Sequence, residues 1–262
     1  MYASRQLATV ILAAGKGTRM KDPGKSKVMF ELKDRPMIQY VVELALEISS
    51  DLVVVVVGYQ KESVMDFIEE EFPNSMGKIA FAHQDEQLGT GHAVMQAAPH
   101  LSDYEGDVLV LSGDVPLLQP ATLKRLIDKH ASEGALATLL TTRMEDPTGY
   151  GRIVRDKNGM VEQIVEEKDA NEEVRRIDEI NVGIYVFKAK TLFETLPQVT
   201  NNNRQGEYYL PDVVKIYVDR GEKVAPLLTE DVEETHGINT VEQLKHAEAL
   251  LLERERQASP AS

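Results

Sequence analysis

The sequence contains no cysteine and no tryptophan among its 262 residues. The absence of cysteine excludes disulfide bonds, thiol nucleophiles and thiolate metal sites, and it suits a protein of the cytoplasm. The sequence also lacks an apolar run long enough to cross a bilayer, and residues 1–20 lack the pattern of a signal peptide. We therefore expect a cytoplasmic protein with no membrane partner.

Positive charge is also scarce. The 29 Lys and Arg residues stand against 43 Asp and Glu residues, which gives a net charge of −14. So few cations cannot form the broad basic face of a general nucleic-acid binder, and we expect no nucleic-acid partner. An apolar content of 42% and a charged content of 27% are typical of a globular protein.

Apolar β-branched runs alternate with amphipathic helical patterns in the first half of the chain. Strands are expected at Leu7–Leu12, Leu52–Val57, Lys78–His83, Asp107–Ser112 and Ala135–Thr142. Helices are expected at Pro36–Ile48, Glu62–Phe72, Gly91–Ala98 and Pro120–Ala131. Continuous apolar strands separated by helices predict an α/β fold, with a Rossmann-like, mainly parallel sheet and helices on both faces. Such sheets bind ligands beyond the carboxyl ends of their strands.

The pattern changes after about Arg143. Asn158-Gly159 predicts a hairpin between short strands at 153–155 and 161–166, because this dipeptide accepts positive φ. The charged stretch Glu166–Glu179 is interpreted as a solvated surface. A returning strand (182–187), a helical stripe (206–220) and a closing helix (about 241–256) follow. The sequence has no Pro/Ser-rich linker, so we expect one domain over 1–256, with parts at about 1–142 and 143–240 and a disordered tail at 257–262.

The most informative segment follows the first strand and is Leu12-Ala13-Ala14-Gly15-Lys16-Gly17-Thr18-Arg19-Met20. Glycine allows the backbone to approach a ligand closely, and oriented N–H groups can surround a polyphosphate. From residue 16 to residue 27, five cations stand against one acid, a local charge of +4. The spacing fits neither the dinucleotide fingerprint nor the Walker A loop. A turn with exposed lysines is the alternative interpretation.

Four segments carry a family resemblance that extends from about residue 7 to residue 240. They are Leu12–Met20, Gln87–Ala93, Asp146–Arg152 and Asn201–Tyr209. Together they resemble the bacterial N-acetylglucosamine-1-phosphate uridyltransferase domain of the nucleotide-sugar pyrophosphorylase superfamily. The first segment is common to the superfamily, whereas the last two are more selective for the N-acetylglucosamine branch.

The resemblance implies an activity. The phosphate of N-acetylglucosamine-1-phosphate would attack the α-phosphorus of UTP with Mg²⁺ as cofactor, giving UDP-N-acetylglucosamine and pyrophosphate. Such a transfer depends on positioning and electrostatic stabilisation. Residues 1–142 would then form the nucleotide-binding part, and residues 143–240 a small β-rich sugar-binding lobe.

The resemblance also implies individual roles. Arg19 would contact the leaving pyrophosphate, and Lys27 would bridge the substrate and product phosphates. The nucleotide-binding residues would be Leu12, Ala13, Ala14, Gly15, Gln84, Gly89, Thr90, Ser112, Gly113 and Asp114. The sugar-binding residues would be Gly151, Glu166, Asn181 and Asn239. Asp114 and Asn239 would hold the metal, which accords with the few protein oxygens that Mg²⁺ takes.

Several of these assignments have a competing explanation. Asp114 could be a turn-forming residue after glycine, Asn239 could cap the closing helix, and Glu166 could be plain surface charge. Lys25 competes with Lys27, because the loop is one residue longer than in the family and has serine where a proline is expected. We favour Lys27, since apolar residues follow it as they follow the family lysine.

Two other functions compete with the leading hypothesis. One is a transferase that uses another hexose-1-phosphate or a thymidine nucleotide, and the other is a non-catalytic sensor of sugar nucleotides. The larger members of the family continue into a β-helical acetyltransferase domain, and the sequence contains no hexapeptide repeat of that kind. We expect no acetyl transfer, and the sequence leaves the oligomeric state open.

Overall fold

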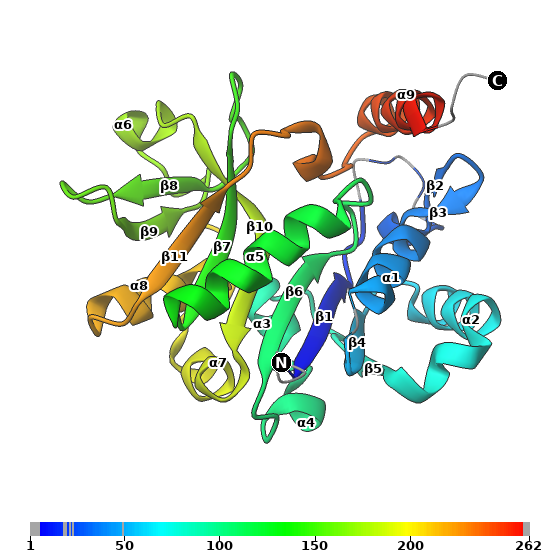
Figure 1. Ribbon diagram of the computed structural model, residues 1–262, viewed down its shortest axis with the longest axis horizontal. Helices are drawn as coiled ribbons and strands as arrows, with labels where there is room; N and C mark the ends of the chain where they lie inside the picture. The colour runs from blue at the N-terminus through cyan, green and yellow to red at the C-terminus, as the bar shows by residue number, and fades with distance from the viewer. Residues whose placement is uncertain (1–5, 18–19, 21, 23, 49, 259–262) are drawn as a thin grey trace.

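The computed structural model describes residues 6–17, 20, 22, 24–48 and 50–258. Its centre is a nine-stranded sheet whose main path runs β11-β7-β10-β6-β1-β4-β5 (Figure 1). The strands on this path are β1 (Leu7–Ala13), β4 (Leu52–Val57), β5 (Ile79–His83), β6 (Asp107–Ser112), β7 (Ala137–Arg143), β10 (Glu179–Lys188) and β11 (Val224–Leu228). A hairpin of β8 (Arg152–Arg155) and β9 (Val161–Val165) joins it through β10, and β2 (Glu31–Leu32) pairs with β3 (Arg35–Pro36) separately.

Most neighbouring strands of this path are parallel. Strands β6, β1, β4 and β5 run in one direction, and β11 runs parallel to β7. Strand β10 lies between β6 and β7 and is antiparallel to both. The predicted α/β fold with a mainly parallel sheet is therefore confirmed. A strand from the second half of the chain completes the sheet of the first half, so both parts share one sheet.

Helices cover both faces of the sheet. One face is covered by α1 (Met37–Glu47), α2 (Lys61–Glu71) and α5 (Pro120–Glu133), and the other by α3 (Thr90–Met95), α4 (Ala98–Leu101), α7 (Ala189–Thr195) and α8 (Pro211–Asp219). Short α6 (Glu172–Arg175) and the closing helix α9 (Val241–Ala258) lie outside these layers (Figure 1). Short 3-10 helices occur at Lys27–Met29, Pro73–Lys78, Leu196–Gln198 and Glu233–Thr235.

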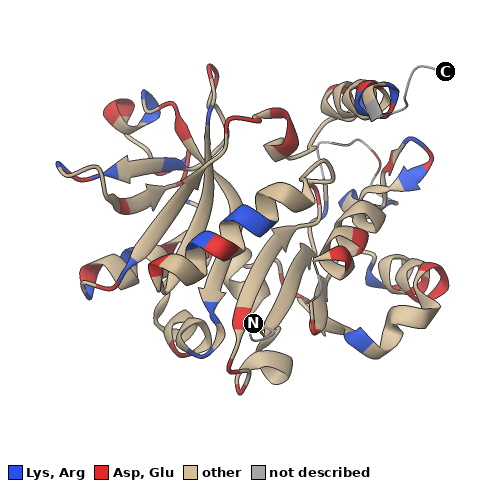
Figure 2. Ribbon diagram, in the orientation of Figure 1, with Lys and Arg blue, Asp and Glu red and all other residues tan. Residues whose placement is uncertain are grey.

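The central strands are buried on both faces. Val10 and Val54 pack under one layer of helices, whereas Ile11 and Val55 pack under the other. This two-sided burial explains why these strands are continuous apolar runs in the sequence. Charged residues lie mainly on the surrounding helices and loops (Figure 2). Within the described part of the chain, no helix combines the length and apolarity that crossing a bilayer requires.

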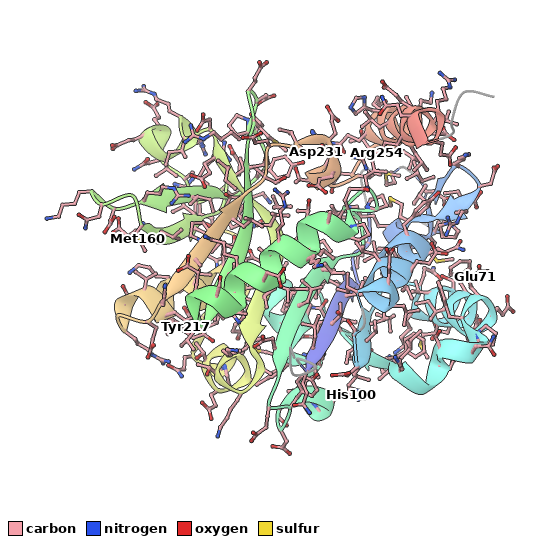
Figure 3. All side chains as sticks on the ribbon, in the orientation of Figure 1. Glu71, His100, Met160, Tyr217, Asp231 and Arg254 are labelled. Atoms are coloured by element: carbon pink, nitrogen blue, oxygen red, sulfur yellow. The ribbon has the colours of Figure 1, made fainter. Side chains whose placement is uncertain are left out.

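The segment before α9 is held against the first half of the chain by a buried carboxylate. Glu234 is 1% exposed and accepts hydrogen bonds from the Gln119 N–H at 3.0 Å and the Thr122 hydroxyl at 2.6 Å. Helix α9 itself packs on Leu32 and Met37. Arg254 of this helix donates a hydrogen bond to Asp231 at 3.3 Å, and both residues are labelled in Figure 3. These contacts fix the position of residues 237–240.

Several expected elements differ from the structure. The helix expected over 91–98 is two short helices, and α7 and β11 were not predicted. The expectation that Glu166–Glu179 is solvated throughout is wrong at its ends: Glu179 is 4% exposed, because Arg155 and Thr141 bind its carboxylate. Helix α9 includes residues 257 and 258, which were expected in a disordered tail, and residues 259–262 lie outside the described part.

Candidate functional site

Two adjoining cavities lie at the carboxyl edge of the parallel strands. The larger has a volume of about 300 Å³ and the smaller about 180 Å³. Leu12, Thr90 and Ser112 line both cavities, so a ligand can extend from one into the other. This is the edge at which α/β sheets bind their ligands.

The end of β1 and the loop after it form one wall of the larger cavity. Leu12, Ala14 and Gly15 line this cavity. Side chains alternate along a strand, and the side chain of Ala13 accordingly packs into the core on the other face. Gly17 has a φ of +62°, and a Cβ there would lie 2.7 Å from Cβ of Lys27, so glycine is required for this close approach. The predicted phosphate contact Arg19 lies outside the described residues.

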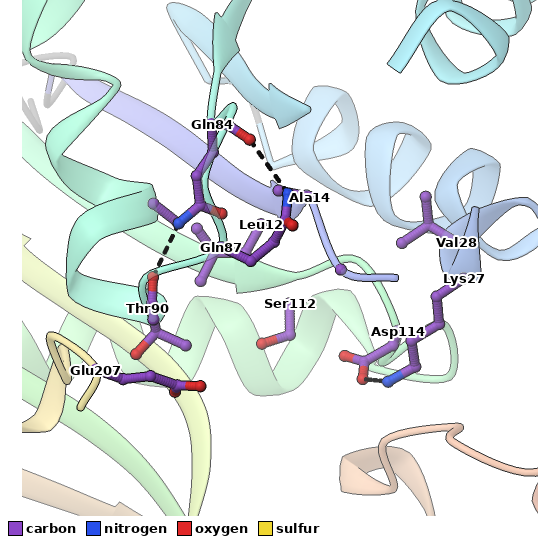
Figure 4. A pocket seen from close by; sticks show the side chains of 13 residues that line it. Leu12, Ala14, Lys27, Val28, Gln84, Gln87, Thr90, Ser112, Asp114 and Glu207 are labelled. Atoms are coloured by element: carbon purple, nitrogen blue, oxygen red, sulfur yellow. Dashed lines mark hydrogen bonds and ion pairs between the residues drawn. The ribbon is translucent and has the colours of Figure 1, made fainter. Parts of the chain in front are cut away.

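Lys27 joins two residues that are far apart in the sequence. Its ammonium group forms an ion pair with the Asp114 carboxylate (Figure 4) and donates a hydrogen bond to Oδ1 of Asn239 at 2.7 Å. The backbone N–H of Ile238 also donates to the Asp114 carbonyl at 2.9 Å. The structure thus brings Lys27, Asp114 and Asn239 together at one end of the larger cavity, although Asn239 itself does not line that cavity.

The closing helix does not need the Asn239 side chain as its cap. Thr240 Oγ1 accepts from the N–H of Gln243 at 3.2 Å, and Gln243 Oε1 accepts from the N–H of Thr240 at 3.1 Å. This reciprocal arrangement is a capping box, whose Thr-x-x-Gln spacing is visible in the sequence. The side chain of Asn239 instead faces Lys27 and the Gly237 carbonyl.

The two lysines of the loop have different surroundings. Lys25 pairs with Glu31 at 3.1 Å on the surface, whereas the side chain of Lys27 is 13% exposed and lines the larger cavity. The geometry therefore favours Lys27 over Lys25 as a ligand contact.

The oxygens of Asp114 and Asn239 suit a divalent cation. Both converge on one ammonium group, so the protein already places two hard oxygen donors around a single positive charge. No group of three or more His, Asp or Glu side chains that could hold a metal occurs among the described residues. A Mg²⁺ ion commonly takes one or two protein oxygens and completes its shell with phosphate and water. The donor set fits that habit.

The far end of the larger cavity is built by the loop after β5. Gln84 is 4% exposed, and its Nε2 donates to the Gly89 carbonyl at 3.1 Å and lies 3.1 Å from Nδ1 of His92. Gly89 has a φ of +105°, and a Cβ there would lie 2.6 Å from the carbonyl oxygen of Tyr208. Thr90 Oγ1 accepts from the N–H of Leu210 at 3.1 Å. These bonds join two segments that the sequence analysis singled out separately.

The smaller cavity contains three of the predicted sugar-binding residues. Gly151, Glu166 and Asn181 all line it. The Asn181 N–H donates to the Gly151 carbonyl at 2.8 Å, and a Cβ at Gly151 would lie 3.2 Å from Oε1 of Glu166. Burial, with a further contribution from the nearby carboxylates of Asp169 and Asp212, raises the pKa of Glu166 to about 7. Glu166 is therefore not plain surface charge.

Some lining residues were missed or placed differently by the sequence analysis. Gln87 and Glu207 line the larger cavity, although neither was among the predicted site residues. Tyr185 lines the smaller cavity without any signal in the sequence. Gly113 was expected to bind the ligand but does not line either cavity; its N–H donates to the Leu12 carbonyl at 2.9 Å and so shapes the strand end.

Comparisons with known proteins identify the family of this chain. Residues 8–233 match the nucleotidyl transferase family. The chain is 47% identical over 245 residues to the bifunctional protein GlmU of Listeria welshimeri and 45% identical over 249 residues to that of Halalkalibacterium halodurans. These alignments cover 94% and 95% of this chain but 52% and 53% of the relatives, so the chain spans about half of their length.

Solved structures share the fold at low sequence identity. A UDP-glucose pyrophosphorylase complexed with UDP-glucose aligns with a TM-score of 0.76 and 19% identity, covering 95% of this chain and 99% of its own. A putative glucose-1-phosphate thymidylyltransferase from Bacillus anthracis, in complex with a sucrose, aligns with a TM-score of 0.73 and 19% identity, over 93% of this chain and 94% of its own. At this identity the likeness establishes the shared architecture.

Proposed function

This chain belongs to the nucleotidyl transferase family, and from that premise we propose that it joins UTP and N-acetylglucosamine-1-phosphate into UDP-N-acetylglucosamine and pyrophosphate, with Mg²⁺. The observation that carries the proposal is the pair of adjoining cavities. The larger one holds the residues assigned to the nucleotide and the smaller one those assigned to the sugar, and the two share Leu12, Thr90 and Ser112. The reaction would take place in the cytoplasm.

The chemistry is a direct phosphoryl displacement. A phosphate oxygen of the sugar phosphate forms a bond to the α-phosphorus, while the bond from that phosphorus to the bridging oxygen of pyrophosphate breaks. The attacking group is already an oxyanion, so the step needs no general base. Negative charge develops on the phosphoryl oxygens, and catalysis consists of positioning and electrostatic stabilisation.

The cations of the site meet this requirement. Asp114 and Asn239 would hold the Mg²⁺ ion, which neutralises phosphate charge when bound. Lys27 would contact the phosphates from the same end of the larger cavity, and Arg19 would contact the leaving pyrophosphate. The backbone of residues 12–15 would approach the nucleotide, where the small side chains of Ala14 and Gly15 leave room.

The far ends of the two cavities would recognise the base and the sugar. Because Nε2 of Gln84 is engaged with Gly89, its Oε1 would accept the N–H of uracil. Gly89 and Thr90 complete this end of the larger cavity. In the smaller cavity, Glu166 would accept hydrogen bonds from sugar hydroxyls, with Gly151 and Asn181 beside it.

A substrate panel tests the proposal. The protein is supplied with Mg²⁺, with UTP or thymidine triphosphate, and with hexose-1-phosphates that do or do not carry an acetamido group. Pyrophosphate release is followed, and the sugar nucleotide is identified by mass spectrometry. We expect UTP and N-acetylglucosamine-1-phosphate to give the highest kcat/KM. A preference for glucose-1-phosphate or a thymidine nucleotide would overturn the substrate assignment, and UTP binding without turnover would favour a sensor.

A further inference from the structure

A buried tyrosine of β10 forms part of the smaller cavity and has no role in the proposal above. Tyr185 is 2% exposed and lines this cavity together with Asn181 and Glu166. Its ring stacks on Phe187 with the centroids 5.4 Å apart, which holds the ring in one orientation. A phenol that is buried beside a polar cavity requires a hydrogen-bond partner.

The orientation of the Asn181 amide follows from its neighbours. The backbone N–H of Gly183 donates to Oδ1 of Asn181 at 3.2 Å, so the other end of the amide, Nδ2, faces Tyr185. Nδ2 donates to the Tyr185 hydroxyl oxygen at 2.6 Å. An amide nitrogen carries two hydrogens, so Nδ2 keeps a second one for a ligand of the cavity that Asn181 lines.

The same hydrogen bond directs the proton of the phenol. The Tyr185 oxygen accepts from Asn181, so its own O–H points elsewhere. Burial raises the pKa of Tyr185, and the phenol therefore stays a neutral donor at all physiological pH values. The residues that line the cavity thus include the Asn181 amide, held at its Nδ2 by Tyr185, and the carboxyl group of Glu166.

The Asn181 N–H suits a particular group of the proposed substrate. Hydroxyl groups of a hexose both donate and accept, and they can use the Glu166 carboxylate. The acetamide carbonyl only accepts, and it requires a donor that is held in place. A site built to hydrogen-bond one substrate group discriminates strongly against an analogue that lacks it, because its buried polar groups are then left unpaired.

We propose that Tyr185 is a positioning and specificity residue, which orients the Asn181 amide toward the acetamide carbonyl of the sugar and so selects N-acetylated hexose-1-phosphates. This inference rests on the proposed function and adds to it the residue that sets the preference for the acetylated sugar. Tyr185 acts through Asn181, whose Nδ2 it holds with its hydroxyl oxygen, and it takes no part in the transfer itself.

The test compares Tyr185→Phe with the wild-type protein on two sugars. In Tyr185→Phe, we expect kcat/KM for N-acetylglucosamine-1-phosphate to fall about tenfold, mainly through KM, while that for glucose-1-phosphate changes less than about twofold. The KM for UTP stays the same. Calorimetry with UDP-N-acetylglucosamine and UDP-glucose provides a second readout that does not depend on turnover, and it should show the same loss of preference.

Two further variants separate a specific role from a structural one. Tyr217→Phe removes the hydroxyl of another fully buried tyrosine outside both cavities, and it should leave the sugar preference unchanged. Asn181→Ala should lower the preference by itself, and the double variant Asn181→Ala/Tyr185→Phe should be no less selective than Asn181→Ala, because Tyr185 acts through Asn181.

The outcomes distinguish this inference from the proposed function. If the wild-type protein does not prefer the acetylated sugar, the proposed function fails. If the wild-type protein prefers it and Tyr185→Phe retains that preference, or loses activity equally on both sugars, the role of Tyr185 is overturned. Independent, multiplicative losses in the double variant would also overturn it.

Discussion

Lys27 occupies a position that a divalent cation would share. Its ammonium group lies against the oxygens of Asp114 and Asn239, whereas Lys25 pairs with Glu31 on the surface. Both lysines stand in the same loop and carry the same charge, so their difference arises from burial and partners. Surface ion pairs contribute little, whereas a preorganised cation beside the phosphates stabilises the developing charge.

We therefore expect unequal effects of alanine substitution in this loop. Lys27→Ala should lower kcat on the order of 10²–10³-fold, because it removes one preorganised electrostatic contact. Lys25→Ala, the matched control, should change kcat by less than about threefold, since its ion pair is exposed. Steady-state rates of pyrophosphate release measure both. The reverse order would assign the phosphate contact to Lys25.

Glu166 predicts a pH dependence of stability. Its pKa is raised to about 7 in the folded protein, above the ordinary value near 4.5 of the unfolded chain, so between these values the folded state binds more protons. The free energy of unfolding therefore falls as the pH rises through this window. The Glu166→Gln variant has no charge to bury at this position. Its free energy of unfolding minus that of the wild type should therefore increase by about 1–3 kcal/mol from pH 5 to pH 8.

Urea unfolding of the ligand-free protein at several pH values measures this effect. Glu162→Gln provides the control, because Glu162 is exposed on the preceding strand β9. The stability difference between this control and the wild type should stay constant with pH. A flat difference for Glu166→Gln as well would mean that Glu166 is ionised in the folded protein throughout this range.

The turn that begins helix α3 depends on one glycine. Gly89 has a φ of +105°, and a Cβ there would meet the Tyr208 carbonyl oxygen at 2.6 Å. The same turn carries the N–H of Gly91, which donates to that carbonyl at 2.8 Å. Any side chain at Gly89 therefore strains the backbone and separates the two segments that this hydrogen bond joins.

Alanine substitution at two glycines separates the backbone strain from the collision. Gly89→Ala should lower the free energy of unfolding by about 2–4 kcal/mol, since it combines positive φ with a backbone clash. Gly134→Ala at the end of α5 also has positive φ, +60°, but has open space around it, and it should cost about 1 kcal/mol. Denaturant unfolding measures both. Equal losses would show that the contact with Tyr208 relaxes without cost.

Strand β10 shows how one element joins the two parts of the molecule. It enters the sheet antiparallel between β6 and β7, so its first residues lie at the carboxyl end of β6. Asn181 and Gly183 thereby reach Ser112, the last residue of β6, and the two cavities meet there. A parallel strand at this position would have placed Asn181 at the opposite edge of the sheet.

The proposed metal site depends on the whole molecule. Asp114 follows β6, and Asn239 precedes α9, which packs on the first half of the chain. Glu234 and the capping box of Gln243 hold the segment between them in place. The two proposed ligands therefore act as one unit that exists only in the assembled fold.

Non-additive effects of substitution follow from this arrangement. Asp114→Ala and Asn239→Ala should each lower kcat on the order of 10²–10³-fold and leave the protein folded, because both residues are polar and only partly buried. The kcat of the double variant should be less than about tenfold below the kcat of the less active single variant. Mn²⁺ binding followed by electron paramagnetic resonance checks the same coupling without turnover. Independent, multiplicative losses would show that the two residues do not share an ion.

Much of this molecule was predictable from local patterns. The apolar runs at 52–57 and 107–112 are strands with the predicted bounds, because burial on both faces leaves a continuous signature. The short helix α7 and the edge strand β11 were not predicted, because their patterns are brief and their stability comes from neighbours. Most of the predicted site residues line the two cavities, although Ala13, Gly113 and Asn239 do not, and the role of Arg19 stays a prediction.

The sequence by itself determined the alternation of strands and helices, the glycine loop after β1 and the cap of α9, since each depends on residues a few positions apart. Only the tertiary structure decided that Lys27 lies between Asp114 and Asn239, and that Glu166 and Tyr185 share a cavity. Long-range packing sets those neighbours, and burial among them sets the pKa of each group.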